Sequence, residues 1–382
     1  MSNEIPRRNF LSRSLFAIAT AMAAPSLSFS ESFKKAYKSS DPTMNPILNT
    51  KPLGFQWETS DPFLFCVHHE DAFPKGNEQM GPDATYLNGR HMGDDFIIKD
   101  GFRMYHGKSV PGFPGHPHRG FETITVVRKG IVDHADSMGA AGRYGNGDVQ
   151  WMTAGKGVQH SEMFPLVHAD KENTMELFQI WLNLPKRNKM VEPHFKMFWR
   201  ESIPNHIHID SNNKKTTIEV IAGKLEKSDA PAPPPNSWAA DPINEVAVWN
   251  IKMEEGATYT LQKASAGINR TIYFYEGNDI TVAGTTIKNY HAIELKSDVD
   301  VIITSGSHDT SILLLQGKPI GEPVMQYGPF VMNTKQEIND AFEDYHKTQF
   351  GGWPWPKFDQ VHARDKSRFA KYADGTMEVK NS

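Results

Sequence analysis

Four side chains in the first half of the chain have the types and the spacing of a metal site. His116 and His118 lie in GHPHRGFET, and His160 and Glu162 lie in GKGVQHSEM. In an extended strand, alternate residues share a face, so each pair would direct two donor groups the same way. Two such strands facing each other could enclose one metal ion.

Three imidazoles and one carboxylate form a donor set suited to several divalent metals. Iron, manganese, nickel, copper and zinc all accept this mixture of nitrogen and oxygen ligands. Such a site leaves coordination positions free for water or a substrate, and this openness favours chemistry over a purely structural role. A single His-x-His pair would be weak support, because histidines also occur in strands as ordinary core or surface residues. The second pair, His160 and Glu162, makes a metal site the better interpretation.

The segment between the two pairs is predicted to form strands that bring them together. ETITVVRKGIVDHADSMG is typical of a strand, a turn at Lys129–Gly130 and a second strand. Asn146–Asp148 supplies another turn before VQWMTAGKGVQH. We therefore expect a small antiparallel β-barrel with the metal ligands on its inner face.

The same residues carry a family resemblance. HPHRGFET, GDVQWMTAGKGVQHSEM, WLNLPKRNKMVEPHF and GKPIGEPVMQYGPFVMNT closely resemble motifs of the pirin family, within the cupin superfamily. The resemblance runs from about Phe55 to about Trp353. It implies an all-β protein with two cupin domains, which are small antiparallel barrels of the jelly-roll type, and a short C-terminal helix.

The resemblance also implies what the site contains. The first barrel of a pirin holds one non-haem Fe(II) through residues that match His116, His118, His160 and Glu162, with Mn, Ni, Cu or Zn as alternative metals. Many other cupins take their carboxylate from the first motif, where this chain has Glu122. We follow the pirin pattern and keep Glu122 as a residue of the pocket or of the groups that surround the ligands.

Further polar residues lie beside the ligand motifs. Arg119 and Gly120 follow the first ligand strand, where glycine permits a bend and arginine could pair with a carboxylate of Glu122 or of a substrate. His134 and Asp136 form another alternating pair, in VDHADS, and are the main rivals to the assigned ligands. The pirin resemblance places them outside the metal shell, so we interpret them as structural polar residues.

The composition describes a globular chain that is long enough for two separate cores. Of its 382 residues, 38% are hydrophobic and 11% are aromatic. The formal charge of −4 is spread along the chain without a basic block, which disfavours nucleic acid as a partner. No stretch is apolar for long enough to span a bilayer as a mature helix, so we expect no membrane anchor once the leader is removed.

The first residues resemble an export signal. MSNEIPRRNFLSRSLFAIATAMAAPS contains Arg7, Arg8, Phe10 and Leu11, then a modestly apolar run and a small-residue site at Ala21–Ala23. This order resembles a twin-arginine signal peptide. It implies an interaction with the twin-arginine export machinery and a location in the bacterial periplasm or outside the cell.

Changes in composition along the chain suggest five segments. These are a signal peptide with its cleavage region (1–30), a linker (31–54), the metal-binding barrel (55–225), a second barrel with the terminal helix (226–352) and a charged tail (353–382). The second barrel contains no His-x-His or His-x-Glu pair. We expect it to have a structural or pocket-shaping role.

The terminal helix has sequence signals at both ends. Thr334–Glu337 forms a capping box at its start. Ile338, Phe342 and Tyr345 follow at helical spacing on one face, and Gly351–Gly352 stops the helix.

Two functions are consistent with these features. The one we favour is a metal-dependent oxidoreductase, a dioxygenase resembling quercetin 2,3-dioxygenase, that uses O2 and a small phenolic substrate. In this reaction the catalytic residue Glu162 would accept the substrate's proton. The alternative is a non-catalytic iron-binding or redox-sensing bicupin that binds a protein or small-molecule partner. A carbohydrate-binding barrel with incidental histidines fits less well, because two ligand pairs match.

Overall fold

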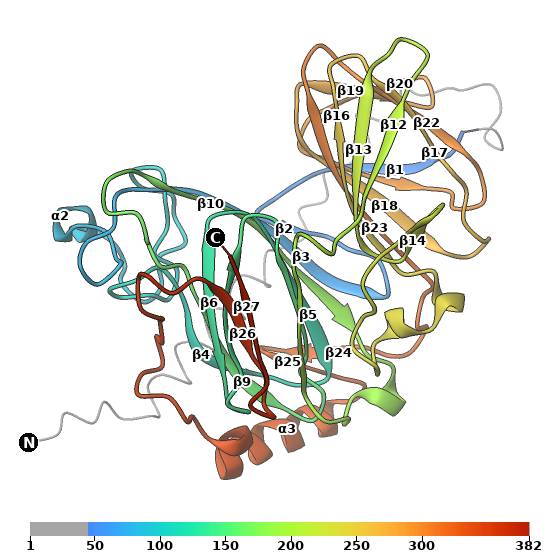
Figure 1. Cartoon of the computed structure of the whole chain (residues 1–382). Helices are drawn as coiled ribbons and strands as arrows, with labels where there is room; N and C mark the ends of the chain where they lie inside the picture. The colour runs from blue at the N-terminus through green and yellow to red at the C-terminus, as the bar shows by residue number, and fades with distance from the viewer. Residues whose placement is uncertain (1–44, 382) are drawn as a thin grey trace, which may run out of the picture. The chain divides into compact units, whose positions relative to one another are not determined.

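The computed structural model describes residues 45–381 and contains two compact units built mostly of β-strands (Figure 1). The site barrel holds residues 55–203, 231–241 and 320–381, and the second barrel holds 45–54, 204–230 and 242–319. The all-β prediction with a short C-terminal helix is confirmed. Within the described residues, no helix has the length and apolar character needed to cross a membrane. The predicted signal peptide, residues 1–30, lies outside this range.

The site barrel contains two six-stranded antiparallel sheets. The first sheet has the order β11-β8-β5-β10-β3-β2. Its strands are β11 (His194–Phe198), β8 (Val149–Thr153), β5 (Phe121–Lys129), β10 (Asn173–Asn183), β3 (Phe63–Phe73) and β2 (Gln56–Trp57). Between β3 and the second sheet, a long segment forms only the short helix α2 (Ala84–Leu87).

The second sheet of the site barrel carries the histidine motifs and has the order β27-β26-β7-β6-β9-β4. Its strands are β27 (Met377–Lys380), β26 (Arg368–Lys371), β7 (Ala141–Gly145), β6 (Ile131–Asp136), β9 (Val158–Met163) and β4 (Gly112–His118). β9 (VQHSEM) is buried along its whole length although four of its six residues are polar. Burial of so many polar groups is costly unless they have partners. The polar side chains of β9 therefore indicate a functional site on this strand.

The terminal helix begins where the sequence predicts, but it ends at Thr348, with Gln349 as a left-handed C-cap, and not at the predicted stop Gly351–Gly352. α3 (Lys335–Thr348) has Thr334 as its N-cap, whose side chain accepts a hydrogen bond from the Glu337 amide. Ile338 and Tyr345 are buried on the predicted face. A short 3-10 helix, Gln349–Gly351, follows the α-helix.

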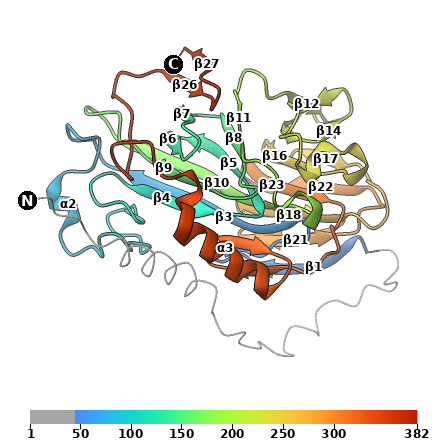
Figure 2. The same ribbon diagram turned by 90° about the horizontal axis from the view of Figure 1, so that it is seen from below.

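This helix belongs to the site barrel, whereas the sequence segmentation groups it with the second barrel. α3 packs on the hairpin of β24 (Met325–Tyr327) and β25 (Phe330–Met332), as Figure 2 shows. The Val331 amide of that hairpin donates to the Arg119 carbonyl at 3.0 Å. The Tyr345 hydroxyl donates to Gln159 Oε1 at 2.8 Å. These bonds attach the segment to the ends of the two histidine strands.

The predicted charged tail adds two strands to the site barrel. β26 pairs with β7, and β27 pairs with β26. Arg143 on β7 fixes the approach to this hairpin, because its guanidinium donates to the carbonyls of His362, Ala363 and Lys366. The same group forms a buried bidentate ion pair with Asp133, with both distances at 2.7 Å.

The second barrel is built on a seven-stranded sheet of order β1-β21-β18-β23-β16-β13-β12 and a four-stranded sheet of order β17-β22-β19-β20. The strands are β1 (Ile47–Pro52), β12 (Asn205–Ile209), β13 (Lys215–Ala222), β16 (Ala247–Met253), β17 (Thr258–Leu261), β18 (Asn269–Glu276), β19 (Asp279–Val282), β20 (Thr285–Lys288), β21 (His291–Leu295), β22 (Val301–Ser305) and β23 (Thr310–Gly317), with the small hairpin β14 (Lys224–Leu225) and β15 (Ser228–Asp229). Its core contains a large cluster of apolar side chains, such as Ile218, Ile251 and Leu314.

Two further sequence boundaries differ from the observed division. Residues 205–222 form β12 and β13 of the second barrel, although the predicted first barrel extends to residue 225. Residues 47–52, expected in a linker, form β1 and pair with β21. Both differences have the same physical origin. β1, β12 and β13 complete the backbone hydrogen bonding of the seven-stranded sheet in the second barrel.

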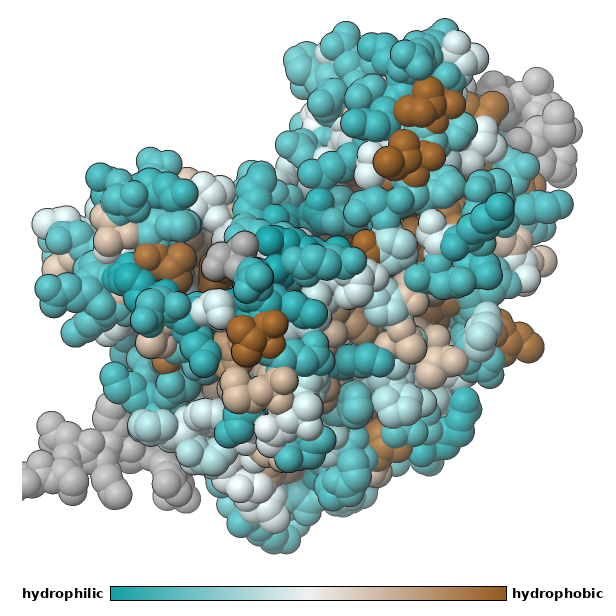
Figure 3. All heavy atoms as spheres, in the orientation of Figure 1, coloured by the Kyte–Doolittle hydropathy of each residue, from teal (hydrophilic) through white to brown (hydrophobic). Residues whose placement is uncertain are grey.

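The surface carries scattered apolar side chains on a largely hydrophilic background (Figure 3). Ile207 and Ile209 on β12 and Met377 and Val379 on β27 are among the exposed apolar residues. Isolated apolar side chains of this kind are ordinary on a globular protein.

Candidate metal centre

Strands β4 and β9 lie side by side and set the geometry of the site. In their antiparallel register His116 faces His160, and Phe113 faces Glu162. The register shifts between Phe113 and His116, where two residues of β4, Pro114 and Gly115, lie opposite one residue of β9 and form a bulge with one extra residue. Bulges re-aim side chains next to functional sites, and an edge strand such as β4 tolerates proline.

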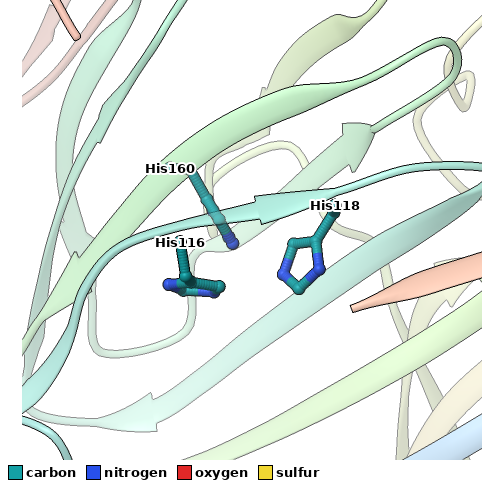
Figure 4. Close-up of side chains that lie close together, drawn as sticks. All are labelled: His116, His118 and His160. Carbon is teal, nitrogen blue, oxygen red and sulfur yellow. The ribbon is translucent and has the colours of Figure 1, made fainter. Parts of the chain in front are cut away.

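His116, His118 and His160 point toward one another from these two strands (Figure 4). The ligand atoms they offer all lie within 4.8 Å of one another. His118 and His160 are buried, and His116 is partly exposed, so the cluster is most accessible on the His116 side. Within residues 45–381 this is the one group of three or more His, Cys, Asp or Glu residues with metal-site geometry.

The ring nitrogens of two of these histidines are oriented by backbone carbonyls. His116 Nδ1 donates to the Pro114 carbonyl at 2.9 Å, and His118 Nδ1 donates to the Pro329 carbonyl at 3.4 Å. A carbonyl only accepts, so Nδ1 carries the proton in both rings and Nε2 keeps its lone pair for a metal.

Burial keeps the three rings neutral. It lowers the pKa of His116 to about 4 and lowers the pKa of His118 and of His160 well below the ordinary value. Neighbouring histidines lower the His118 and His160 pKa values further, because adjacent imidazoles disfavour a shared positive charge. Neutral imidazole is the form that binds a metal, so the cluster needs no deprotonation near pH 7.

Glu162 lies beside the triad in a polar setting of its own. Its Oε2 is 3.9 Å from His160 Nε2. Thr125 Oγ1 donates to Oε1 at 2.7 Å, and Gln179 Nε2 donates to Oε2 at 2.6 Å. Burial raises the Glu162 pKa above its ordinary value, and the bond from Thr125 opposes this shift. The carboxyl is therefore held rigidly and has an increased affinity for a proton.

The donor set fits a metal ion. His160 is completely buried, and neither of its ring nitrogens has a hydrogen-bond partner among the described residues. Buried polar atoms normally have partners, so an unpaired imidazole facing two others is the arrangement expected of a ligand. The three histidines could hold a metal. Glu162, the predicted fourth ligand, is not part of this group, because both of its oxygens accept hydrogen bonds from other side chains.

Two residues predicted near the ligands have other roles. Glu122 lies three residues before Thr125 on β5, so its side chain lies on the opposite face of the strand from Thr125, which bonds Glu162. It accepts hydrogen bonds from Thr153 and Ser237, and burial raises its pKa to about 7. Arg119 pairs with a carboxylate that the sequence did not suggest, Asp344 on α3, at 2.9 Å.

Gly120 supplies the bend that the sequence predicts after the first ligand strand. Its φ is +84°, and a Cβ atom there would lie 2.0 Å from the Val331 carbonyl oxygen. Only glycine fits this conformation without strain. The bend lets the chain leave β4 and enter β5 in the opposite sheet.

Sequence reasoning missed the two residues that hold the Glu162 carboxyl. Gln179 is the one amide in the apolar run MELFQIW, and Thr125 continues the Thr123 face of β5. A polar side chain isolated in an apolar strand was the available signal. Trp181 packs against Phe121 and also lies 5.4 Å from the His118 ring, measured between ring centroids.

Comparison with protein families identifies the fold. Residues 53–182 match the Pirin family model, and residues 248–351 match the model of the Pirin C-terminal cupin domain. The chain belongs to the pirin family. A pirin-like protein from Caulobacter vibrioides is 35% identical over 260 residues, which cover 68% of this chain and 88% of that protein.

Two further similar proteins carry the name of an enzyme. A Pseudomonas aeruginosa protein named "Putative quercetin 2,3-dioxygenase" is 34% identical, covering 63% of this chain and 79% of that protein. A crystal structure titled quercetin 2,3-dioxygenase from Acinetobacter baumannii has a TM-score of 0.62 at 27% identity, covering 80% of this pirin and 98% of that chain. Pirins of this kind are cupins, which agrees with the predicted bicupin.

Proposed function

We propose that this pirin is a metal-dependent dioxygenase that oxidises a small phenolic compound with O2. The observation that carries the proposal is the buried cluster of three neutral imidazoles beside a buried carboxyl group. A metal in this cluster would supply Lewis acidity toward a phenolate and a place for oxygen to react. The names of the relatives described above support the same reaction class.

The surroundings of the cluster suit an aromatic substrate. The Phe113 ring lies 6.3 Å from the His116 ring, and the Trp181 ring lies 5.4 Å from the His118 ring, both between centroids. Sites for small organic ligands are mostly apolar with a few placed polar groups, and aromatic rings favour planar partners. Because His116 is the least buried member of the triad, we expect the substrate to approach from its side.

Glu162 would take the phenolic proton, and its hydrogen bonds accommodate both protonation states. Thr125 has one hydroxyl proton but two oxygen neighbours, Glu162 Oε1 at 2.7 Å and Gln179 Oε1 at 2.8 Å. When Glu162 is ionised, the Thr125 hydroxyl donates to it. When Glu162 is protonated, it donates to Thr125, and the Thr125 hydroxyl turns to Gln179. Proton acceptance therefore needs no loss of a hydrogen bond.

We further propose that the metal is Fe(II) and that the folded protein is exported by the twin-arginine route. Copper and zinc bind such donor sets more tightly than iron, so a protein that folded outside the cytoplasm would tend to take those metals. If the protein folds and binds its metal before export, the metals available in the cytoplasm determine which ion it carries. The arginine pair that supports export, Arg7 and Arg8, lies outside the described residues.

Oxygen uptake tests the proposed reaction. The full-length protein, purified and loaded with Fe(II), should consume O2 with quercetin or a simpler catechol, and the metal-free protein should not. As a matched control, His160→Ala should lose the reaction, whereas His291→Ala in the second barrel should keep it. Stoichiometric metal binding without oxygen uptake for any phenol tested would refute the dioxygenase and favour the non-catalytic bicupin.

A further inference from the structure

One ligand histidine lacks the support that the other two receive. His116 and His118 each donate Nδ1–H to a backbone carbonyl. His160 Nδ1 has no hydrogen-bond partner within residues 45–381, although the side chain is completely buried. Metal-binding histidines normally donate their second ring N–H to an acceptor, which fixes the tautomer and the ring orientation. An acceptor for His160 is therefore expected close by.

His134 on β6 is the neighbouring group with a matching unused atom. Its ring centroid lies 5.5 Å from that of His160, and it is also completely buried. His134 faces Glu162 across the β6–β9 ladder, and Asp136 faces His160. Its Nδ1, like that of His160, has no partner among the described residues. Two buried, unpaired ring nitrogens thus belong to adjacent rings.

Asp136 determines which nitrogen of His134 carries the proton. Asp136 Oδ2 lies 3.2 Å from His134 Nε2, and a carboxylate only accepts, so Nε2 is the donor. In a neutral ring with Nε2 protonated, Nδ1 is an acceptor. Asp136 is itself fixed, because its Oδ1 accepts from the Met138 and Ala140 amides at 2.9 Å each. The His134 ring also stacks on Phe195, 4.9 Å between centroids.

We propose that His134 is the positioning residue for the metal ligand His160. His134 Nδ1 accepts the hydrogen that His160 Nδ1 donates, through one ordered water held between the two rings, and Asp136 sets the tautomer that makes this possible. A single water can link buried polar atoms that are too far apart for a direct bond. The inference deepens the proposed function, since it assigns His160 Nε2 to the metal.

Two variants test this role with little change in shape. His134→Phe keeps the stacking on Phe195 and removes both ring nitrogens. Asp136→Asn is isosteric: Oδ1 must still accept from the Met138 and Ala140 amides, so the new NH2 group faces His134. His134 must then accept at Nε2 and carry its proton on Nδ1, where it can no longer accept from His160. Phe195→Leu is the control, because it removes the stacking and leaves the polar atoms.

The measurement uses full-length protein loaded with cobalt(II), which shifts the proton signals of its ligands. The wild-type protein should show three shifted imidazole N–H signals, one for each ligand histidine. Both polar variants should lose one of them to rapid exchange with water and bind cobalt roughly 10- to 100-fold more weakly. Phe195→Leu should keep all three signals.

Three results would overturn the inference. Three unchanged signals and unchanged cobalt affinity in both polar variants would show that His134 does not position His160. The assignment of the metal ligands would still stand. Equal losses in Phe195→Leu would show that packing, and not the hydrogen bond, is responsible. A wild-type protein that binds no cobalt would overturn the inference together with the proposed function.

Discussion

Replacing Glu162 by glutamine should slow turnover strongly and leave the fold intact. The change removes the negative charge and the group that accepts the substrate's proton, while the volume stays almost the same. General acid–base catalysis contributes roughly 10²- to 10⁴-fold to a rate, which corresponds to about 3 to 5 kcal/mol in the activation free energy. We expect a loss of oxygen-uptake rate in this range, per bound metal.

The hydrogen bonds around Glu162 explain why the variant should fold. The glutamine oxygen can accept from Gln179 Nε2 in the place of Oε2, and its NH2 group can donate to Thr125 Oγ1. The Thr125 hydroxyl then donates to Gln179 Oε1, as it does when Glu162 is protonated. Every buried polar group keeps a partner, so the free energy of unfolding should change by less than about 1 kcal/mol.

The assay compares oxygen uptake, bound metal and thermal unfolding in Glu162→Gln and in a control. Glu343→Gln makes the same chemical change on the exposed face of α3 and should match the wild-type protein in all three measurements. Native turnover per metal in Glu162→Gln would refute the proton-accepting role. A large fall in stability would refute the proposed rearrangement of hydrogen bonds.

Three other predictions concern stability and export. Arg143→Met should lower the free energy of unfolding by roughly 3–5 kcal/mol in a denaturant titration, because it leaves the buried Asp133 carboxylate without its ion pair; an unchanged midpoint would contradict this. Wild-type stability should fall as pH rises from about 4.5 to about 7, by up to about 1.4 kcal/mol per unit, because the folded Glu122 carboxyl keeps its proton after the unfolded one has lost it. Glu122→Gln should flatten this fall of stability with pH. A fall that persists in the variant would show that another group causes it. Changing both Arg7 and Arg8 to lysine should keep the protein in the cytoplasm with its leader uncleaved, and normal export would point to another route.

The clustering of the histidines could be predicted because it depends on local geometry. Alternation along an extended strand puts His116 and His118 on one face, whatever the rest of the chain does. To predict the cluster, the pairing of β4 with β9 was also needed. The strand and turn signals between the two strands limited the possible pairings. The family resemblance then supplied the bicupin architecture.

The surroundings of the site depend on pairing between distant segments, and the sequence does not record that pairing. The bonds to Glu162 come from Thr125 and Gln179, which lie 37 and 17 residues away. The partner of Arg119 is 225 residues away. No periodicity within a strand identifies such partners.

The boundaries between the units were also beyond local reasoning. Residues 47–52 are mostly exposed and have no alternating pattern, yet they form β1, because the edge of β21 offers unpaired backbone groups. Backbone hydrogen bonding of this kind places few demands on side chains. A polar segment such as this one therefore looks like a linker until the edge beside it is known.

The metal content of the protein purified from its own host tests the central claim most directly. We predict close to one metal ion per chain, with His160→Ala losing most of it and His291→Ala keeping it. The difference should arise because His160 belongs to the triad, whereas His291 on β21 donates its Nδ1–H to the nearby Asn289 carbonyl. A second tightly bound ion, or equal losses in the two variants, would contradict the assignment of the site to β4 and β9.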